Sequence, residues 1–184
     1  TLNTLAMEEA TLTEYGLDWD DTQEASDHLP RVFDITLNNL DIGVDFNAGW
    51  NLVGLPLEVD DAHYQILFPE SVEGTLYSFN GVYMQGNELL HGSGYWLLFE
   101  NSGNVTIIGN GLNQLIIELN QGWNLISGIS IELPLESIED PENLIIPGTV
   151  YSYENVYFQP DSFQPGNGYW LRSSGTGAII LNQN

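Results

Sequence analysis

Carboxylates are the most abundant side chains here that could do chemistry, with 26 Asp and Glu residues in a chain of 184. A glycosidase uses two carboxylates held roughly 5–10 Å apart in different environments. Acidic residues do recur in corresponding loops, at Glu58, Asp60, Asp61, Glu136, Glu139, Asp140 and Glu142. Their spacing singles out no pair, and acidic loops are usually solvated surface. We therefore predict no catalytic residue, and we expect the protein not to be an enzyme.

A second kind of chemistry open to this sequence is cation binding. In residues 18–21 (DWDD) the alternating carboxylates of Asp18, Asp20 and Asp21 have the oxygen spacing of a calcium loop. The segment lacks the Gly and the terminal Glu of an EF-hand, so an unliganded acidic loop is the alternative. Calcium is the one cofactor that the sequence suggests. The three histidines are scattered through dissimilar segments, which argues against a zinc site.

Aromatic side chains offer a third possibility, recognition of a ligand or partner. Tyr83, Tyr157, Phe158 and Phe163 fall at expected hairpin tips and loops, where they would be partly exposed. Exposed rings stack on sugars and also anchor protein contacts, and the sequence does not choose between these partners. Four of the five Trp residues are instead flanked by Leu, Val and Ile, and we predict that they pack in the core: Trp50, Trp96, Trp123 and Trp170.

The charge balance excludes several function classes. Arg31 and Arg172 are the only basic residues apart from histidine, and the formal net charge is -24. Such a chain has no cluster of cations with which to bind nucleic acid or anionic lipid headgroups. It has no Lys for Schiff-base chemistry and no Cys for disulfides. No apolar run is long enough to span a bilayer, so we expect no membrane insertion. The acidity fits either solubility in salty water or cation binding.

The elements that position these residues are expected to follow an internal repeat in the sequence. Residues 49–53 (GWNLV) return 73 positions later as residues 122–126 (GWNLI). Residues 76–79 (LYSF) and 94–97 (GYWL) return 74 positions later as 150–153 (VYSY) and 168–171 (GYWL). A framework repeated at this distance is typical of duplicated architecture.

Short strands separated by Gly and Asn turns run through both copies. Asn80 and Gly81 form the strongest two-residue hairpin signal, with Glu154 and Asn155 in the matching place. We therefore predict an all-β chain of two tandem β-sandwich or barrel-like repeats, each with five to six strands, over residues 46–112 and 113–184. Residues 1–45 would form an N-terminal extension with an acidic loop and one or two strands.

The two copies also resemble a known family. Residues 49–56 (GWNLVGLP) and 122–129 (GWNLISGI), each followed by Tyr-x-Tyr or Tyr-x-Phe and then Gly-x-Gly-Tyr-Trp, are similar to a tandem β-repeat of large exported bacterial and archaeal cell-surface proteins, including surface-layer-like and secretion-sorted proteins. The resemblance covers residues 46–183. It implies an accessory module without catalytic residues, at the cell surface or in the secreted fraction. The chain departs from the family at Ser93 and Asn167, where Lys is common.

Together these features predict a non-catalytic extracellular structural or interaction module of a prokaryotic surface protein. Its partners would be other copies of itself or neighbouring surface domains. A strand at residues 32–37 or 42–46 that pairs with another copy would build a filament or surface array by strand addition, whereas pairing within its own chain would give a monomer. The alternative is a carbohydrate-binding accessory module of a secreted hydrolase, with a polysaccharide as partner.

Overall fold

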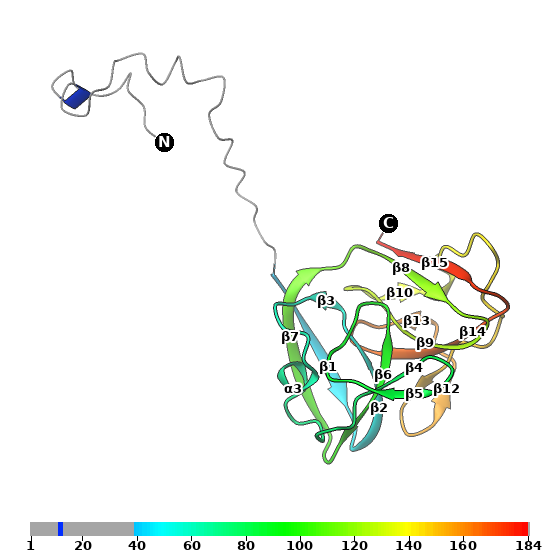
Figure 1. Ribbon diagram of the computed structural model, residues 1–184, viewed down its shortest axis with the longest axis horizontal. Helices are drawn as coiled ribbons and strands as arrows, with labels where there is room; N and C mark the ends of the chain where they lie inside the picture. The colour runs from blue at the N-terminus through cyan, green and yellow to red at the C-terminus, as the bar shows by residue number, and fades with distance from the viewer. Residues whose placement is uncertain (1–10, 13–38, 184) are drawn as a thin grey trace. The chain divides into compact units, whose positions relative to one another are not determined.

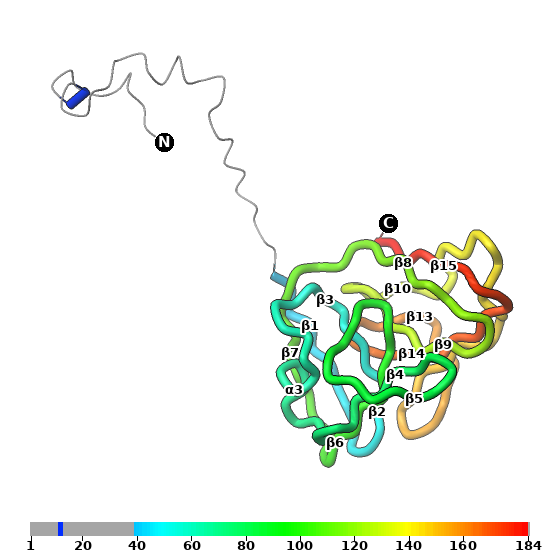
Figure 2. The backbone as a smooth tube through the Cα atoms, viewed as in Figure 1, coloured from blue at the N-terminus to red at the C-terminus, as the bar shows by residue number. Residues whose placement is uncertain are grey.

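The computed structural model describes residues 11–12 and 39–183. The chain divides into two compact units, Thr1–Thr36 and Leu37–Asn184. In the first unit Thr11 and Leu12 are helical. The strand predicted at residues 32–37 lies outside the described residues. The second unit contains both repeats, which pack together as one body (Figure 2).

The first half of this unit consists of seven strands in two antiparallel sheets (Figure 1). The strands are β1 (Asn39–Phe46), β2 (Gly49–Gly54), β3 (Leu57–Glu58), β4 (Tyr77–Phe79), β5 (Tyr83–Gln85), β6 (Gly94–Phe99) and β7 (Gly103–Gly111). One sheet has the order β1-β7-β3 and the other has the order β2-β6-β4-β5. A single helical turn, α3 (Tyr64–Leu67), lies between β3 and β4.

The second half repeats this plan with eight strands. They are β8 (Gln114–Leu119), β9 (Gly122–Ser127), β10 (Leu133–Pro134), β11 (Ser152–Tyr153), β12 (Tyr157–Phe158), β13 (Ser162–Phe163), β14 (Gly168–Ser173) and β15 (Gly177–Asn182), with a 3₁₀ turn at Leu135–Ser137. The antiparallel pairs are β8 with β15, β9 with β14, β11 with β12 and β10 with β13. The prediction of an all-β fold is confirmed. Each half has more strands than the five to six expected, because several are only two or three residues long.

Matched strands occupy matched places in the two halves. The pair β1–β7 corresponds to β8–β15, and β2–β6 corresponds to β9–β14. Each half has its own core between its sheets, to which β6 contributes Tyr95, Leu97 and Phe99, and β14 contributes Tyr169 and Leu171. A third, smaller cluster lies between the halves and contains Leu52, Leu125 and Trp170 with partly buried aromatic rings around them.

Two equivalent backbone hydrogen bonds join the two halves, one donated by each half. The Gly54 N–H donates to the Gly166 carbonyl oxygen at 2.9 Å, and the Ser127 N–H donates to the Gly92 carbonyl oxygen at 3.0 Å. Gly54 and Ser127 are equivalent positions, as are Gly92 and Gly166. Swapping the halves therefore turns one hydrogen bond into the other, which is the signature of an approximate two-fold relation.

This close approach explains the glycines that flank the junction. A Cβ placed on Gly54 would lie 2.2 Å from the Cβ of Ser127, so only one of these two equivalent positions has room for a side chain. A Cβ on Gly94 would lie 2.4 Å from the Ile126 carbonyl oxygen, and one on Gly168 would lie 2.9 Å from the Val53 carbonyl oxygen. The Gly-x-Gly motif thus lets the backbone of one half approach the other.

The sequence left open whether residues 42–46 pair within their own chain or with another copy. Strand β1 begins at Asn39, inside the predicted extension, and pairs over all its eight residues with β7 of the same chain. Residues 42–46 are therefore paired in cis. The loop at Gly166 also lies against β1, since a Cβ there would be 2.3 Å from Val44.

The hairpin turn also differs from the prediction. Phe79 pairs with Tyr83, so the loop has three residues rather than two, and Gly81 alone takes a positive φ of 74° within it. The matching loop after Tyr153 is the same, with φ of 63° at Asn155. A two-residue turn would instead have placed Val82 opposite Phe79.

Candidate functional site

The Gly-Trp-Asn motif builds a turn that presents a tryptophan to solvent. Gly49 takes a φ of 99°. The buried side chain of Asn51 then holds the turn, because its Oδ1 accepts from the Asn47 N–H at 2.9 Å and its Nδ2 donates to the carbonyl oxygens of Asn47 and Gly49. Trp50, which lies between Gly49 and Asn51 in the sequence, is left 39 % exposed.

The second copy repeats this turn closely. Asn124 accepts from the Asn120 N–H at 2.9 Å and donates to the carbonyl oxygens of Asn120 and Gly122, where φ is 98°. Trp123 is 43 % exposed. The motif is therefore a device for holding an indole at the surface, and not a core-packing signal as the sequence suggested.

Strand alternation sends the other two tryptophans to the same side. In β6 the side chains of Tyr95 and Leu97 enter the core of the first half, so Trp96 between them must point to the opposite face of the sheet. Trp170 takes the same place in β14 and is 8 % exposed. Both indoles lie where the halves meet, outside the two main cores.

The three-residue hairpin turns complete the site with tyrosines. Because Tyr83 pairs with Phe79, the two rings lie on one face and contact edge-on, with centroids 5.4 Å apart. Tyr153 and Tyr157 form the equivalent contact at 5.1 Å. The tips of both hairpins thus carry an exposed tyrosine toward the junction, with exposures of 56 % for Tyr83 and 54 % for Tyr157.

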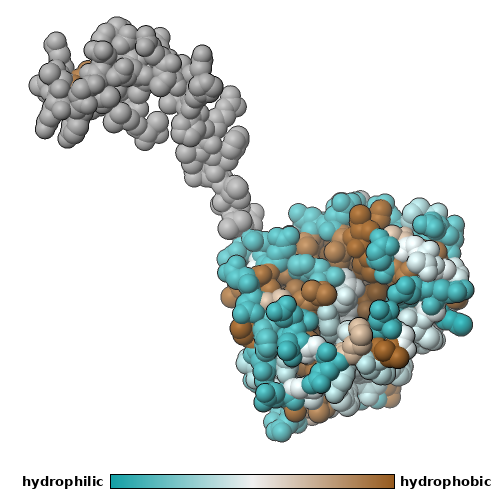
Figure 3. Space-filling model, in the orientation of Figure 1, coloured by the Kyte–Doolittle hydropathy of each residue, from teal (hydrophilic) through white to brown (hydrophobic). Residues whose placement is uncertain are grey.

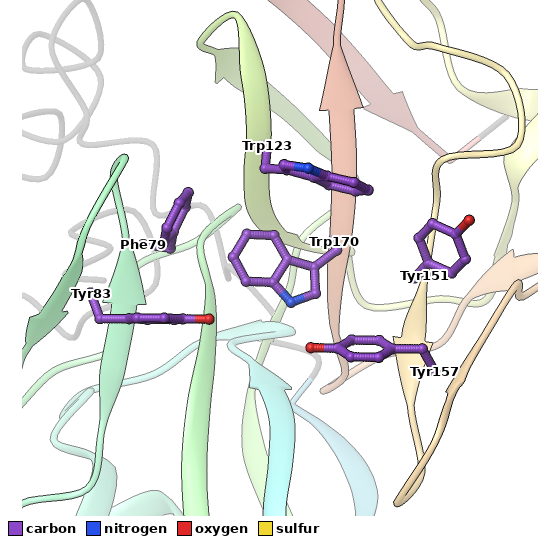
Figure 4. A pocket seen from close by; sticks show the side chains of 6 residues that line it. All are labelled: Phe79, Tyr83, Trp123, Tyr151, Tyr157 and Trp170. Atoms are coloured by element: carbon purple, nitrogen blue, oxygen red, sulfur yellow. The ribbon is translucent and has the colours of Figure 1, made fainter.

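These side chains form a pocket at the junction with a volume of about 460 Å³. Figure 4 shows Trp170 at its centre, with the Trp123 ring on one side and the rings of Tyr83 and Tyr157 edge-on to the viewer on the other. Trp123 and Trp170 are nearly perpendicular, at 87° with centroids 6.2 Å apart. Its full lining is Phe79, Tyr83, Trp123, Tyr151, Tyr157 and Trp170.

A second pocket is the counterpart of the first. Its volume is about 540 Å³, and Trp50 and Trp96 meet in it at 85° with centroids 6.4 Å apart. Every lining residue has its equivalent in the first pocket, and Tyr83 and Tyr157 belong to both. Its full lining is Trp50, Tyr77, Tyr83, Trp96, Tyr153 and Tyr157. We call the two together the paired aromatic pockets.

In the wall that the two pockets share, the surroundings of Tyr157 favour its neutral hydroxyl. Burial raises the pKa of the Tyr157 hydroxyl, and the neighbouring Tyr83 raises it further, while a hydrogen bond with Trp170 acts in the opposite direction. Figure 4 shows the hydroxyls of Tyr83 and Tyr157 pointing toward one another. No carboxylate lines either pocket in the described part of the chain.

The predicted contact residues divide into three groups. Tyr83 and Tyr157 line the pockets, as a contact role requires. Phe158 is exposed but lies outside the pocket linings. The prediction for Phe163 is wrong, because its side chain is fully buried in the core of the second half, against Tyr169.

The core prediction for the four tryptophans is wrong for Trp50 and Trp123, which are exposed, whereas Trp170 is buried and Trp96 is half-buried. Sequence reasoning also missed Phe79, Tyr77, Tyr151 and Tyr153 as pocket residues. The repeated Tyr-x-Tyr and Tyr-x-Phe segments were their signal, since residues two apart in a strand share one face.

Among the described residues, the acidic candidates form no comparable site. Asp18, Asp20 and Asp21 lie outside the described residues. Within residues 11–12 and 39–183, no three His, Cys, Asp or Glu side chains gather in a way that could hold a metal ion. Among the acidic loops, Asp140 has a structural role, because its carboxylate accepts from the N–H groups of Leu144 and Ile145 at 2.8 Å each.

Figure 3 shows hydrophilic residues over much of the visible face, with separate apolar areas between them. The few helical segments among the described residues all fall short of the length and apolarity that a membrane span needs.

Comparison with known proteins gives no relative for this chain: it matches no family model, no curated protein and no solved structure. The resemblance of the repeats to those of exported surface proteins therefore stays a prediction. The class of the protein is defined by fold and site alone, as an all-β chain with paired aromatic pockets.

Proposed function

We propose that this chain is a non-catalytic binding module of an extracellular or cell-surface protein, and that the paired aromatic pockets are its binding site. One observation carries the proposal: Trp50, Trp123, Tyr83 and Tyr157 are all solvent-exposed at one junction. Large aromatic side chains are normally buried, so a contiguous exposed group of them marks an interaction surface.

The energetic cost of this exposure supports a binding role. Each exposed indole leaves apolar surface in contact with water. Burial of that surface in a core would stabilise the fold by about 25 cal/mol per Å². The Gly-Trp-Asn turn nevertheless holds Trp50 and Trp123 outward by the same hydrogen bonds in both halves. A chain that maintains such an arrangement twice uses it to contact something other than itself.

We propose a discrete module rather than a filament built by strand addition. Residues 42–46, one of the two candidate donor strands, are paired with β7 of their own chain. Polysaccharide is a candidate ligand class for these pockets, because exposed Trp and Tyr faces stack on sugar rings. A polysaccharide ligand would fit the role of an accessory module in a secreted hydrolase.

The test is a ligand panel read by tryptophan fluorescence and calorimetry on the full chain. The panel contains soluble polysaccharides, proline-rich peptides and organic cations. The double variant Trp50→Ala/Trp123→Ala should abolish binding of any ligand found, since aromatic anchors often contribute about 2 kcal/mol or more each. Val156→Ala is the matched control, because Val156 is 68 % exposed in the hairpin loop next to Tyr157 and lines neither pocket. Unchanged binding by the folded double variant would refute the proposed site.

A further inference from the structure

We propose that each of the paired aromatic pockets binds an organic cation bearing a trimethylammonium group, two per chain. This inference rests on the proposed function and names its ligand class. It depends on the composition of the lining, the orientation of the rings, the charge of the chain and the equivalence of the pockets.

The lining favours a ligand with few hydrogen-bonding needs. All six side chains of each pocket are aromatic, and their polar atoms are limited to tyrosine hydroxyls and indole N–H groups. A sugar brings several hydroxyls, and each one buried without a partner costs free energy. A site that selects sugars adds amide and carboxylate side chains, and none lines either pocket in the part of the chain that the structure describes.

Ring orientation favours a compact cation over a flat ligand. Trp170 is nearly perpendicular to Trp123 at 87° and to Tyr83 at 82°. Figure 4 shows the resulting box, with Trp170 between Trp123 and the two tyrosines. A flat sugar ring uses one face or two parallel faces, whereas a tetrahedral trimethylammonium group contacts walls that stand at right angles. Cations bind over aromatic faces because the ring quadrupole is negative there.

The charge of the chain acts in the same direction. At a formal net charge of -24, the protein attracts cations from solution and repels anions. Because the surface charge is screened within about 8 Å at physiological salt, this attraction weakens as salt is added. The uncharged aromatic walls then select a weakly hydrated organic cation over a strongly hydrated metal ion.

The approximate two-fold relation explains why small ligands suit the pair. Each lining residue of one pocket has its equivalent in the other, and ring geometry repeats closely, with Phe79–Trp170 at 4.9 Å and Trp96–Tyr153 at 5.0 Å. A polysaccharide or peptide has a direction, so a single chain crossing both pockets would meet them in opposite senses. Two separate small cations can instead bind one in each pocket, in equivalent surroundings.

The decisive experiment is calorimetric titration of the full chain with choline chloride and with its neutral isostere 3,3-dimethylbutan-1-ol. Choline should bind at two sites per chain, about tenfold or more tightly than the alcohol, because only choline gains the cation–π attraction. Added NaCl should weaken choline binding and leave the alcohol unaffected. Equal affinities for the two compounds would overturn the inference.

Variants locate the two sites. Trp123→Ala or Trp50→Ala alone should leave one choline site, and the double variant none. Tyr83→Ala should weaken both sites, because Tyr83 lines both pockets. Val156→Ala, the matched control, should retain both. Loss of both sites in Val156→Ala would contradict the assignment, as would two intact sites in a folded double variant.

Further arms of the experiment separate the sources of this group. A trimethyllysine amide and vesicles of phosphatidylcholine present it on a side chain and on a headgroup. The negative chain should bind choline and the amide more tightly than phosphocholine, which carries an anionic phosphate, and the reverse order would contradict the charge argument. If a polysaccharide binds at the tryptophans and choline does not, the proposed function survives and this inference fails. If no panel member binds, both fail.

Discussion

Adding a single carbon at Gly54 perturbs the contact on which the pairing of the halves depends. In Gly54→Ala the new Cβ would lie 2.2 Å from the Cβ of Ser127, whereas carbon atoms pack best at about 3.5–4.0 Å. The backbones of the two halves must therefore separate by more than an ångström, which also weakens the hydrogen bond from the Gly54 N–H to Gly166. Overpacking of buried sites typically costs 1–3 kcal/mol, and we expect about 3 kcal/mol here.

The assay is thermal and urea unfolding of the full chain. A loss of about 3 kcal/mol from a total of roughly 5–15 kcal/mol should lower the Tm by about 6–12 °C for a unit of this size. Ser127→Gly removes the opposing Cβ, so the double variant should recover part of the loss, with a coupling free energy of about 1 kcal/mol or more. Recovery is incomplete because the new Cβ also lies 3.1 Å from the Asn167 carbonyl oxygen. A stable Gly54→Ala, or strictly additive effects, would refute the two-fold contact.

Three further predictions concern the elements that present the site. Deleting Val82 converts the three-residue turn into a two-residue one and leaves Tyr83 opposite Phe79 on the same sheet face, so ligand affinity should stay within about threefold with little change in Tm; a loss of about tenfold or more would count against the register. Asn124→Ala removes the side chain that holds the turn before Trp123, so urea unfolding should show a free energy of unfolding lower by about 1–3 kcal/mol. An unchanged free energy of unfolding in this variant would disprove the role of Asn124. Burial raises the pKa of Tyr169 from 10.0 to about 12, so the stability that this residue contributes is complete below pH 10 and is lost as pH rises through 12. Tyr169→Phe should therefore flatten the fall in stability between pH 10 and 12, while lowering stability at pH 7 because the Gln164 N–H loses its acceptor; an unchanged alkaline slope would contradict the burial argument.

The repeat and the strand class were readable from the sequence because both depend on local pattern. Matched Gly-Trp-Asn and Gly-Tyr-Trp segments fall in matched strands, β2 with β9 and β6 with β14. The direction of the tryptophans was also readable in part. Tyr95 and Leu97 flank Trp96, and period-two alternation cannot send all three side chains into one core.

The site itself depended on features that local pattern does not contain. Register at the hairpin is decided by one residue in the turn, and Asn80-Gly81 favours a two-residue turn just where the chain makes a three-residue one. Gly54 has no room for a side chain because Ser127, 73 positions later in the chain, packs against it. Local sequence preference does not encode such a long-range contact. Phe163 was misplaced for a related reason, because its partner strand, β10, is only two residues long.

The most direct test of the central claim is the set of indole N–H resonances of the ¹⁵N-labelled chain during titration with choline. The chain has five tryptophans, so single Trp→Phe variants assign every signal. We predict that the resonances of Trp50 and Trp123 shift and saturate together, because they occupy equivalent pockets. Resonances of Trp50 and Trp123 that stay fixed under saturating ligand would contradict the assignment of the paired aromatic pockets as the binding site.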